Sequence, residues 1–248
     1  MTFPTALLAG PTLVLSWLAL GTCVVAQNPA PALTKESFKE TLTRETSLNY
    51  LLALPPGYEA TGDKKWPLVV FLHGAGERGG DLEVLKKHGP PKLVQEGRKF
   101  PFILAVPQCP TDQWWPDEPV LELIDHLQAR LNVDPNRIIL TGLSMGGYGT
   151  WAFAARAPER FAAIVPICGG GTPYLMRRLT KLPIWVFHGG KDPVVALEES
   201  DRLVNALKKN GAKDVQFTIY PEAGHDSWTQ AYATDALYEW MMAQKRQP

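Results

Sequence analysis

Arg137-Ile-Ile-Leu-Thr-Gly-Leu-Ser-Met-Gly146 joins an apolar run to a G-x-S-x-G turn. A strand that ends in this tight turn and then opens a helix is a nucleophile elbow. Because the turn is sharp, Ser144 stands above the sheet, and Gly142 and Gly146 on either side must be small. Ser144 is therefore the candidate nucleophile, and it needs a base, a residue that orients the base and an oxyanion hole.

The base and its orienting residue are expected downstream of Ser144. Asp192 follows the apolar run 183–187, and His225 follows the apolar run 215–220. All three residues thus come just beyond the carboxyl end of a predicted strand, where an open parallel sheet places its site. A serine hydroxyl is a poor nucleophile until an imidazole takes its proton, and a carboxylate on the other ring nitrogen fixes the tautomer. We expect His225 to act as general base and Asp192 to orient it.

Asp192 also has structural interpretations. It precedes Pro193, and aspartate at such a position is typical of a helix N-cap or a turn. Glu222 and Asp226 lie close to His225 in the sequence and are rival carboxylates. The position after a strand and the chain order Ser, Asp, His favour Asp192.

The oxyanion hole is expected from two backbone amides. Met145 follows the nucleophile and begins a helix, where the helix dipole favours negative charge. The segment His73-Gly-Ala-Gly76 follows the third predicted strand, which is where this kind of fold supplies the second donor. Ala75 is the first candidate for that donor and Gly76 the second, whereas His73 is expected to brace the loop.

Strands and helices alternate along the chain at the spacing of βαβ units. This pattern, with the nucleophile after the fifth strand, predicts an α/β-hydrolase fold with a mostly parallel eight-stranded sheet and helices on both faces. A turn is expected at 134–136 and a helix break at 88–91. The predicted strands are residues 38–43 and 48–54, as an antiparallel hairpin, then 67–72, 102–106, 137–141, 161–167, 183–187 and 215–220; the predicted helices are 81–87, 119–131, 145–157, 194–210 and 229–244.

Length and composition fit one globular domain, placed at residues 36–248. The chain of 248 residues is 45% apolar and 20% charged, with zero formal net charge, so it offers no basic field for nucleic acid. The glycine run 169–171 lacks the G-x-G-x-x-G spacing of dinucleotide sites, and the sequence shows no metal-ligand cluster. We expect no cofactor, no metal and no nucleic-acid partner, and no obligate protein partner is evident.

The N-terminal segment differs from the rest of the chain. Residues 6–26 are uncharged and mostly apolar, and Val24-Val-Ala26 suits a signal peptidase. We expect residues 1–26 to be a cleaved secretory signal and 27–35 to be a flexible lead-in, which places the protein in the periplasm or outside the cell. A lipid anchor at Cys23 is one alternative, because Leu20-Gly-Thr-Cys23 loosely resembles a lipoprotein box. A retained membrane helix is another, because the run is about 20 residues long.

Export would leave two cysteines, Cys109 and Cys168, which invites a disulfide in an oxidising compartment. They end strands that should lie three positions apart, or roughly 14 Å, in the sheet. A disulfide needs Cα atoms within about 7 Å. We expect two free, buried thiols.

Two features bear on the substrate. The connection Gly169–Leu182 has only about 14 residues, so no large cap domain is expected and the site should be open. Trp114 and Trp115 follow the fourth strand on the rim that carries Ser144; they form either a binding wall or packing under the next helix. Trp228 is likewise either a rim contact or a support for the histidine loop.

Five stretches resemble bacterial secreted esterases of the α/β-hydrolase superfamily. These enzymes are described as phospholipase/carboxylesterase-like or as predicted peptidases, near dienelactone hydrolases and feruloyl or polyhydroxybutyrate-type esterases, and the likeness covers about residues 36–243. The stretches are Leu51-Leu-Ala-Leu-Pro-Pro-Gly-Tyr58, His73-Gly-Ala-Gly-Glu-Arg-Gly79, His88-Gly-Pro-Pro91, Gly142-Leu-Ser-Met-Gly-Gly-Tyr-Gly-Thr-Trp151 and Gly224-His-Asp-Ser-Trp228.

The resemblance implies a serine hydrolase that cleaves carboxylic esters, small or derived from polymers, through an acyl-enzyme on Ser144. A serine peptidase of the prolyl-oligopeptidase-like type is the alternative, because family members are described both as esterases and as peptidases. A non-catalytic binding protein is a further alternative, disfavoured because all three triad residues are present and such proteins commonly lose one.

Overall fold

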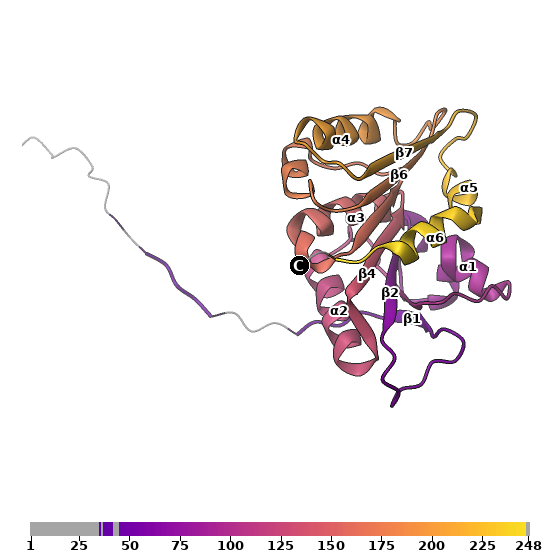
Figure 1. The fold of residues 1–248 in the computed structure, drawn as a ribbon. Coiled ribbons are helices and arrows are strands. Elements are labelled where there is room, and N and C mark those ends of the chain that lie inside the picture. The colour runs from indigo at the N-terminus through magenta and orange to yellow at the C-terminus, as the bar shows by residue number, and fades with distance from the viewer. Residues whose placement is uncertain (1–34, 36, 42–44, 247–248) are drawn as a thin grey trace, which may run out of the picture. The chain divides into compact units, whose positions relative to one another are not determined.

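The computed structural model describes residues 35, 37–41 and 45–246 (Figure 1). The chain divides into two units, residues 1–44 and 45–248. In the first unit the described residues have no regular secondary structure. The predicted signal segment, the lead-in up to residue 34 and Cys23 lie outside the described residues. Within the described part of the chain, no helix is both long and apolar enough to cross a membrane.

The second unit is built on one sheet. Its strands are β1 (Tyr50–Ala53), β2 (Trp66–Leu72), β3 (Ile103–Pro107), β4 (Val133–Leu143), β5 (Ala163–Ile167), β6 (Ile184–Gly189) and β7 (Val215–Tyr220). They lie in the order β1-β3-β2-β4-β5-β6-β7. The edge strand β1 is antiparallel to β3, and the other pairs are parallel. The prediction of a mostly parallel sheet is confirmed.

The prediction of eight strands is wrong: the described residues contain seven. Residues 38–41 form no strand, and residues 42 and 43 lie outside the described part. Phe38 is exposed, so the alternation that indicated a strand there buries no apolar face. β1 pairs with β3 instead of with a hairpin partner.

Helices cover both faces of the sheet, as predicted, because alternate residues of each buried strand point to opposite sides. Leu68, Val70 and Leu72 of β2 belong to the core cluster on one face, and Val69 and Phe71 belong to the cluster on the other. The first cluster includes residues of α2 (Asp117–Arg130), α3 (Met145–Arg156) and α4 (Glu198–Lys209), and the second includes residues of α1 (Gly89–Gln95), α5 (Trp228–Ala233) and α6 (Asp235–Ala243) (Figure 1).

Two expected interruptions are regular structure. The expected break at 88–91 begins α1, because proline is well tolerated in the first turn of a helix, where the missing N–H has no partner to lose. The expected turn at 134–136 is a bulge inside β4: Asp134 Oδ1 accepts the Asn136 amide at 2.9 Å, and the pairing with β2 shifts register there.

Three predicted helices have different bounds or types. Residues 82–87 form a 3-10 helix, η2 (Leu82–Lys87), capped by Asp81. The helix expected from residue 194 begins at Glu198, because the preceding residues form the turn that carries Asp192. The helix expected at 229–244 is divided at Thr234, whose hydroxyl donates to the Gln230 carbonyl at 3.0 Å.

Both cysteines of the second unit are free and buried, as predicted. Cys109 follows β3 and Cys168 follows β5, and the strand order places β3 and β5 three positions apart.

Candidate active site

The nucleophile elbow is present at the end of β4. Ser144 has φ 52° and ψ −117°, a strained backbone conformation that non-glycine residues rarely adopt. A Cβ at Gly142 would lie 2.4 Å from the Gly146 carbonyl oxygen, and a Cβ at Gly146 would lie 2.0 Å from the Leu72 carbonyl oxygen. The flanking glycines are therefore needed because backbones approach each other too closely for a side chain.

Replacing Gly146 by alanine should lower the free energy of unfolding by about 3 kcal/mol, at the upper end of the range for overpacking, because the new methyl meets rigid backbone. Chemical denaturation measures this. Gly80→Ala is the matched control, since a Cβ there has nothing within 4 Å. Equal stabilities of the two variants would contradict the packing argument.

The structure brings Ser144, His225 and Asp192 into one hydrogen-bonded chain. His225 Nε2 lies 2.9 Å from Ser144 Oγ, and His225 Nδ1 lies 2.8 Å from Asp192 Oδ2. Ser144 lies between β4 and α3, Asp192 follows β6 and His225 follows β7. All three residues thus meet at the carboxyl edge of the sheet, where the parallel strands end together.

Asp192 is held on both carboxylate oxygens. Oδ1 accepts the amides of Val194 and Val195, each at 2.9 Å. Asp192 therefore stabilises its own turn through Oδ1 while Oδ2 contacts His225. Burial pushes the pKa of Asp192 upward, but the hydrogen bonds from His225, Val195 and Val194 outweigh it and hold the pKa below its ordinary value. Asp192 is therefore ionised at neutral pH.

The rival carboxylates have other surroundings. Glu222 is exposed and forms an ion pair with Lys191. Asp226 is exposed as well. Asp192 is thus the carboxylate whose hydrogen bond to His225 the structure provides.

The loop His73-Gly-Ala-Gly76 lies beside the nucleophile, with Ala75 and Gly76 in η1 (Ala75–Glu77). A Cβ at Gly74 would lie 2.9 Å from Leu143 Cδ1 and 3.8 Å from Ser144 Cβ. The loop therefore passes close enough to present an amide to a group bound at Ser144. Met145 lies on the other side, as the first residue of α3.

His73 braces this loop, as expected. Burial lowers its pKa to about 4, so the ring is neutral at neutral pH. His73 Nδ1 lies 2.6 Å from the Gly74 carbonyl oxygen, to which it donates, and Nε2 accepts the Cys109 amide at 3.0 Å. The ring thus ties the loop to the chain after β3.

The three candidate substrate-contact tryptophans have different environments. Trp114 is 60% exposed and its ring meets that of Tyr148 at 5.8 Å in an edge contact. Trp115 is only 5% exposed, and its Nε1 donates to the His73 carbonyl at 3.1 Å. The assignment of Trp115 to the substrate is therefore wrong; its ring packs against His73 and beside Gly149 of α3. Trp228 is half-buried and supports His225 through an edge contact at 5.2 Å between ring centroids.

Sequence reasoning missed Tyr148. It lies in the first turn of α3, four residues after Ser144, and its amide donates to the Ser144 carbonyl at 3.0 Å. Its ring contacts that of Trp114 edge-on, and a Cβ at Gly170 would lie 2.8 Å from it. The i, i+4 spacing was a signal that could have found it.

The structure also groups three possible metal ligands that the sequence did not associate. Ligand atoms of Cys168, Asp192 and His225 all lie within 4.8 Å of one another. Burial raises the pKa of the Cys168 thiol to about 12, so it stays protonated at neutral pH. Asp192 and His225 are already hydrogen-bonded to each other. This arrangement suits proton transfer better than metal binding.

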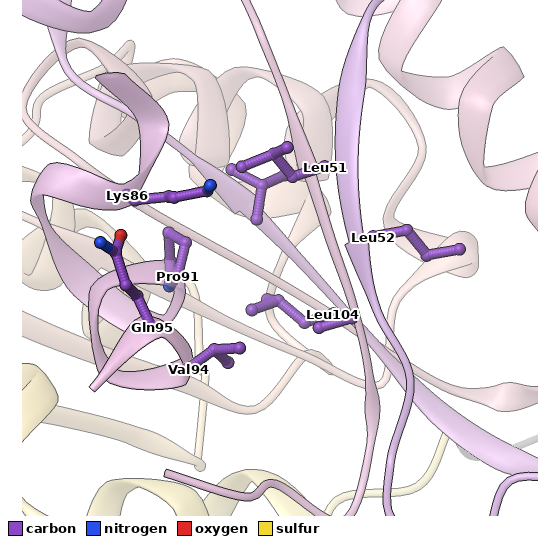
Figure 2. Close-up of a pocket in the computed structure, with 9 residues that line it drawn as sticks. Leu51, Leu52, Lys86, Pro91, Val94, Gln95 and Leu104 are labelled. Carbon is purple, nitrogen blue, oxygen red and sulfur yellow. The ribbon is translucent and has the colours of Figure 1, made fainter. Parts of the chain in front are cut away.

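Two neighbouring cavities lie elsewhere, along β1. One, of about 210 Å³, is lined mainly by apolar side chains of β1, β3 and α1, with Lys86 at its margin (Figure 2). The other, of about 420 Å³, shares Ala53, Val94 and Leu104 with it. Neither is lined by a residue of the candidate triad.

A family model described as "Putative esterase" matches residues 41–170, which include the elbow and the loop that faces it. The chain belongs to this esterase family. A second model, "Dienelactone hydrolase family", matches residues 115–237 of the esterase-family chain and includes the aspartate and the histidine. The predicted α/β-hydrolase esterase relationship and fold are thereby confirmed.

Known proteins similar to this esterase-family chain fall in the same group. It is 30% identical over 122 residues to a "Putative carboxymethylenebutenolidase" of Yersinia pestis, covering 44% of this chain and 45% of that protein. It is 40% identical over 151 residues to "Poly(3-hydroxyalkanoate) depolymerase C" of Paucimonas lemoignei, covering 53% of this chain and 33% of that one. The alignments thus span less than half the length of these curated relatives.

Among solved structures, one described as a thermostable esterase is 37% identical. Its TM-score is 0.66, and the match covers 80% of this chain and 60% of that chain.

Proposed function

We propose that this chain is a serine esterase that cleaves carboxylic esters by acyl transfer through Ser144. The observation that carries the proposal is the continuous chain of short contacts from Asp192 through His225 to Ser144 Oγ. The esterase descriptions of the matching families favour ester hydrolysis over the peptidase alternative.

In the first half-reaction, His225 Nε2 takes the proton of Ser144 Oγ while the oxygen attacks the ester carbonyl carbon. The C–O bond to the alcohol then breaks, and His225 returns the proton to the leaving alkoxide. The acyl group remains on Ser144. Asp192 stays ionised and stabilises the imidazolium that forms during each step.

In the second half-reaction, His225 takes a proton from water, which attacks the acyl-enzyme carbonyl. The carboxylic acid leaves, and Ser144 Oγ regains its proton from His225. Negative charge develops on the carbonyl oxygen in both half-reactions. The Met145 amide, at the N-terminus of α3, and the amide of Ala75, or else of Gly76, are the proposed donors to it.

The test is a panel of p-nitrophenyl esters, feruloyl esters and peptide anilides with the purified protein. We expect kcat/KM for activated esters to exceed that for anilides by several orders of magnitude. A preference for anilides would support the peptidase alternative. No turnover of any substrate by folded protein would support a non-catalytic binding protein.

We also propose that the site is open and suits aromatic or short acyl groups. The connection between β5 and β6 contains only η4 (Pro173–Arg178), which packs against α4. An open surface buries little of a long acyl tail, so it does not recover the roughly 0.8 kcal/mol per methylene that full burial provides.

Trp114→Ala should lower kcat/KM for methyl ferulate about twofold to tenfold, because stacking on tryptophan contributes roughly 0.5–1.5 kcal/mol beyond area burial. Activity on p-nitrophenyl acetate should change little, and activity from C2 to C12 esters should be flat or falling. Trp115→Ala is the matched control: it should lower stability without a selective loss on aromatic esters. A steep rise of kcat/KM toward C12 esters would contradict an open acyl site, and an unchanged aromatic preference in Trp114→Ala would contradict the role of Trp114.

Export is a further part of the proposal, and it is supported by the composition of residues 1–26. N-terminal sequencing of the protein recovered from cells and medium tests it. A start at Gln27 is expected; a start at a lipid-modified Cys23 or an intact Met1 would overturn cleavage after Ala26.

A further inference from the structure

A second histidine lies behind the candidate triad. His188 belongs to the end of β6, and its side chain is fully buried. His188 Nε2 lies 3.4 Å from Asp192 Oδ2, the oxygen that His225 Nδ1 contacts at 2.8 Å. Two imidazoles therefore approach the same carboxylate oxygen, and the esterase mechanism uses only one of them.

The neighbours of His188 define which ring nitrogen carries the proton. Nε2 lies 2.9 Å from the Val195 carbonyl oxygen, which can only accept, so Nε2 carries the hydrogen. In the neutral ring, Nδ1 then accepts from the Ser200 hydroxyl at 2.7 Å. The Ser200 contact with the Gly169 carbonyl is longer, at 3.2 Å, and is the weaker alternative. The Nε2–H therefore donates to the Val195 carbonyl, and Asp192 Oδ2 lies 3.4 Å from the same nitrogen, close enough for an electrostatic contact.

We infer that His188 is a positioning residue that shares Asp192 with His225 and thereby sets the pH range in which His225 acts as a base. The inference rests on the proposed esterase mechanism. The Nε2–H of His188 places partial positive charge beside Oδ2. That charge opposes a second positive charge at the same oxygen, namely the protonated ring of His225. His225 therefore remains a free base to lower pH than it would if it were the one imidazole in contact with Asp192.

Apart from the bond to His225, the contact between His188 and Asp192 Oδ2 is the one around this carboxylate that a side-chain substitution can test. Oδ1 is occupied by two backbone amides, which no side-chain substitution removes. Burial raises the pKa of Tyr148 on α3 and raises that of Cys168 after β5 to about 12, so both are neutral at neutral pH. Charged groups on the elements around the cluster include Asp226 after β7, the ion pair of Glu199 and Arg202 on α4, and the ion pair of Lys191 and Glu222 on the loops that carry Asp192 and His225.

The experiment compares kcat/KM against pH for wild type, His188→Gln, His188→Asn and Ser200→Ala. A glutamine amide nitrogen occupies the position of Nε2 and can donate to Asp192, whereas the shorter asparagine reaches only the position of Nδ1. We expect the acid limb of the profile to move up by about half a pH unit in His188→Asn. It should stay in place in His188→Gln and in Ser200→Ala, which removes a buried hydrogen bond on the far side of the ring.

An unmoved acid limb in His188→Asn, or an equal shift in all three variants, would show a merely structural role and overturn the inference. The ¹⁵N NMR spectrum of the wild-type histidines provides a second measurement that needs no turnover and no variant. We expect His188 to be the neutral Nε2–H tautomer, and an Nδ1–H tautomer would overturn the inference even if His188→Asn does not fold. Full activity of Ser144→Ala would instead refute the esterase mechanism while leaving the tautomer result intact.

Discussion

Ser144→Ala is expected to remove nearly all ester turnover while the fold stays intact. The variant lacks the oxygen that lies 2.9 Å from His225 Nε2, so no acyl-enzyme can form. In a comparable triad, loss of the serine costs about 10⁶ in kcat. The measurement is kcat on a p-nitrophenyl ester, together with covalent labelling by a fluorophosphonate, which should mark Ser144 in the wild type and leave the variant unlabelled.

Ser227→Ala is the matched control for that loss. Ser227 is a buried serine two residues after His225, and it lies outside the contacts that join Asp192, His225 and Ser144. We expect it to retain turnover within about tenfold of wild type, since it removes no charge and no proton-transfer group. Substantial esterase activity in Ser144→Ala would falsify the assignment of the nucleophile.

Asp192→Asn should lower kcat by about 10⁴ at neutral pH. Asparagine has nearly the same shape, and its carboxamide oxygen can still accept the amides of Val194 and Val195. It carries no charge to stabilise the protonated ring of His225, and its NH₂ group, if turned toward Nδ1, selects the wrong tautomer. The expected result is therefore a large loss in kcat with only a modest change in the unfolding midpoint.

The rival carboxylates provide the comparison. Glu222→Gln and Asp226→Asn change exposed side chains, and Glu222 is already engaged with Lys191. We expect both variants to stay within about threefold of wild-type kcat, because exposed charges contribute little. If Asp226→Asn proved more damaging than Asp192→Asn, the orienting role would belong to Asp226.

The contrast between Trp114 and Trp115 shows where sequence reasoning stops. The two residues are adjacent and chemically identical, and both follow the same strand. Trp114 is exposed over Tyr148, and Trp115 is buried with its Nε1 on the His73 carbonyl. Which of two neighbouring side chains points inward in an irregular loop depends on what packs beneath it, which local sequence does not encode.

The hairpin expected from residues 38–43 and 48–54 is absent from the described residues for a related reason. Alternation of polar and apolar residues indicates a strand only where a sheet offers a surface for the apolar face. β1 pairs with β3 and packs in the sheet, whereas Phe38 is exposed. Similarly, Pro90 and Pro91 indicate a helix break in the sequence, whereas their place in the first turn of α1 makes them compatible with a helix.

The amino-acid sequence is enough to predict which strands carry the chemistry, and with them the candidate triad. Apolar runs that end in Gly142-Leu-Ser-Met-Gly146, Asp192 and His225 place all three residues at one edge of a parallel sheet, because parallel strands share their direction. Contacts between segments far apart in the chain become visible in the folded structure alone. The approach of His188 to Asp192 Oδ2 depends on how loops pack in three dimensions, where differences of a few ångströms decide which groups come into contact.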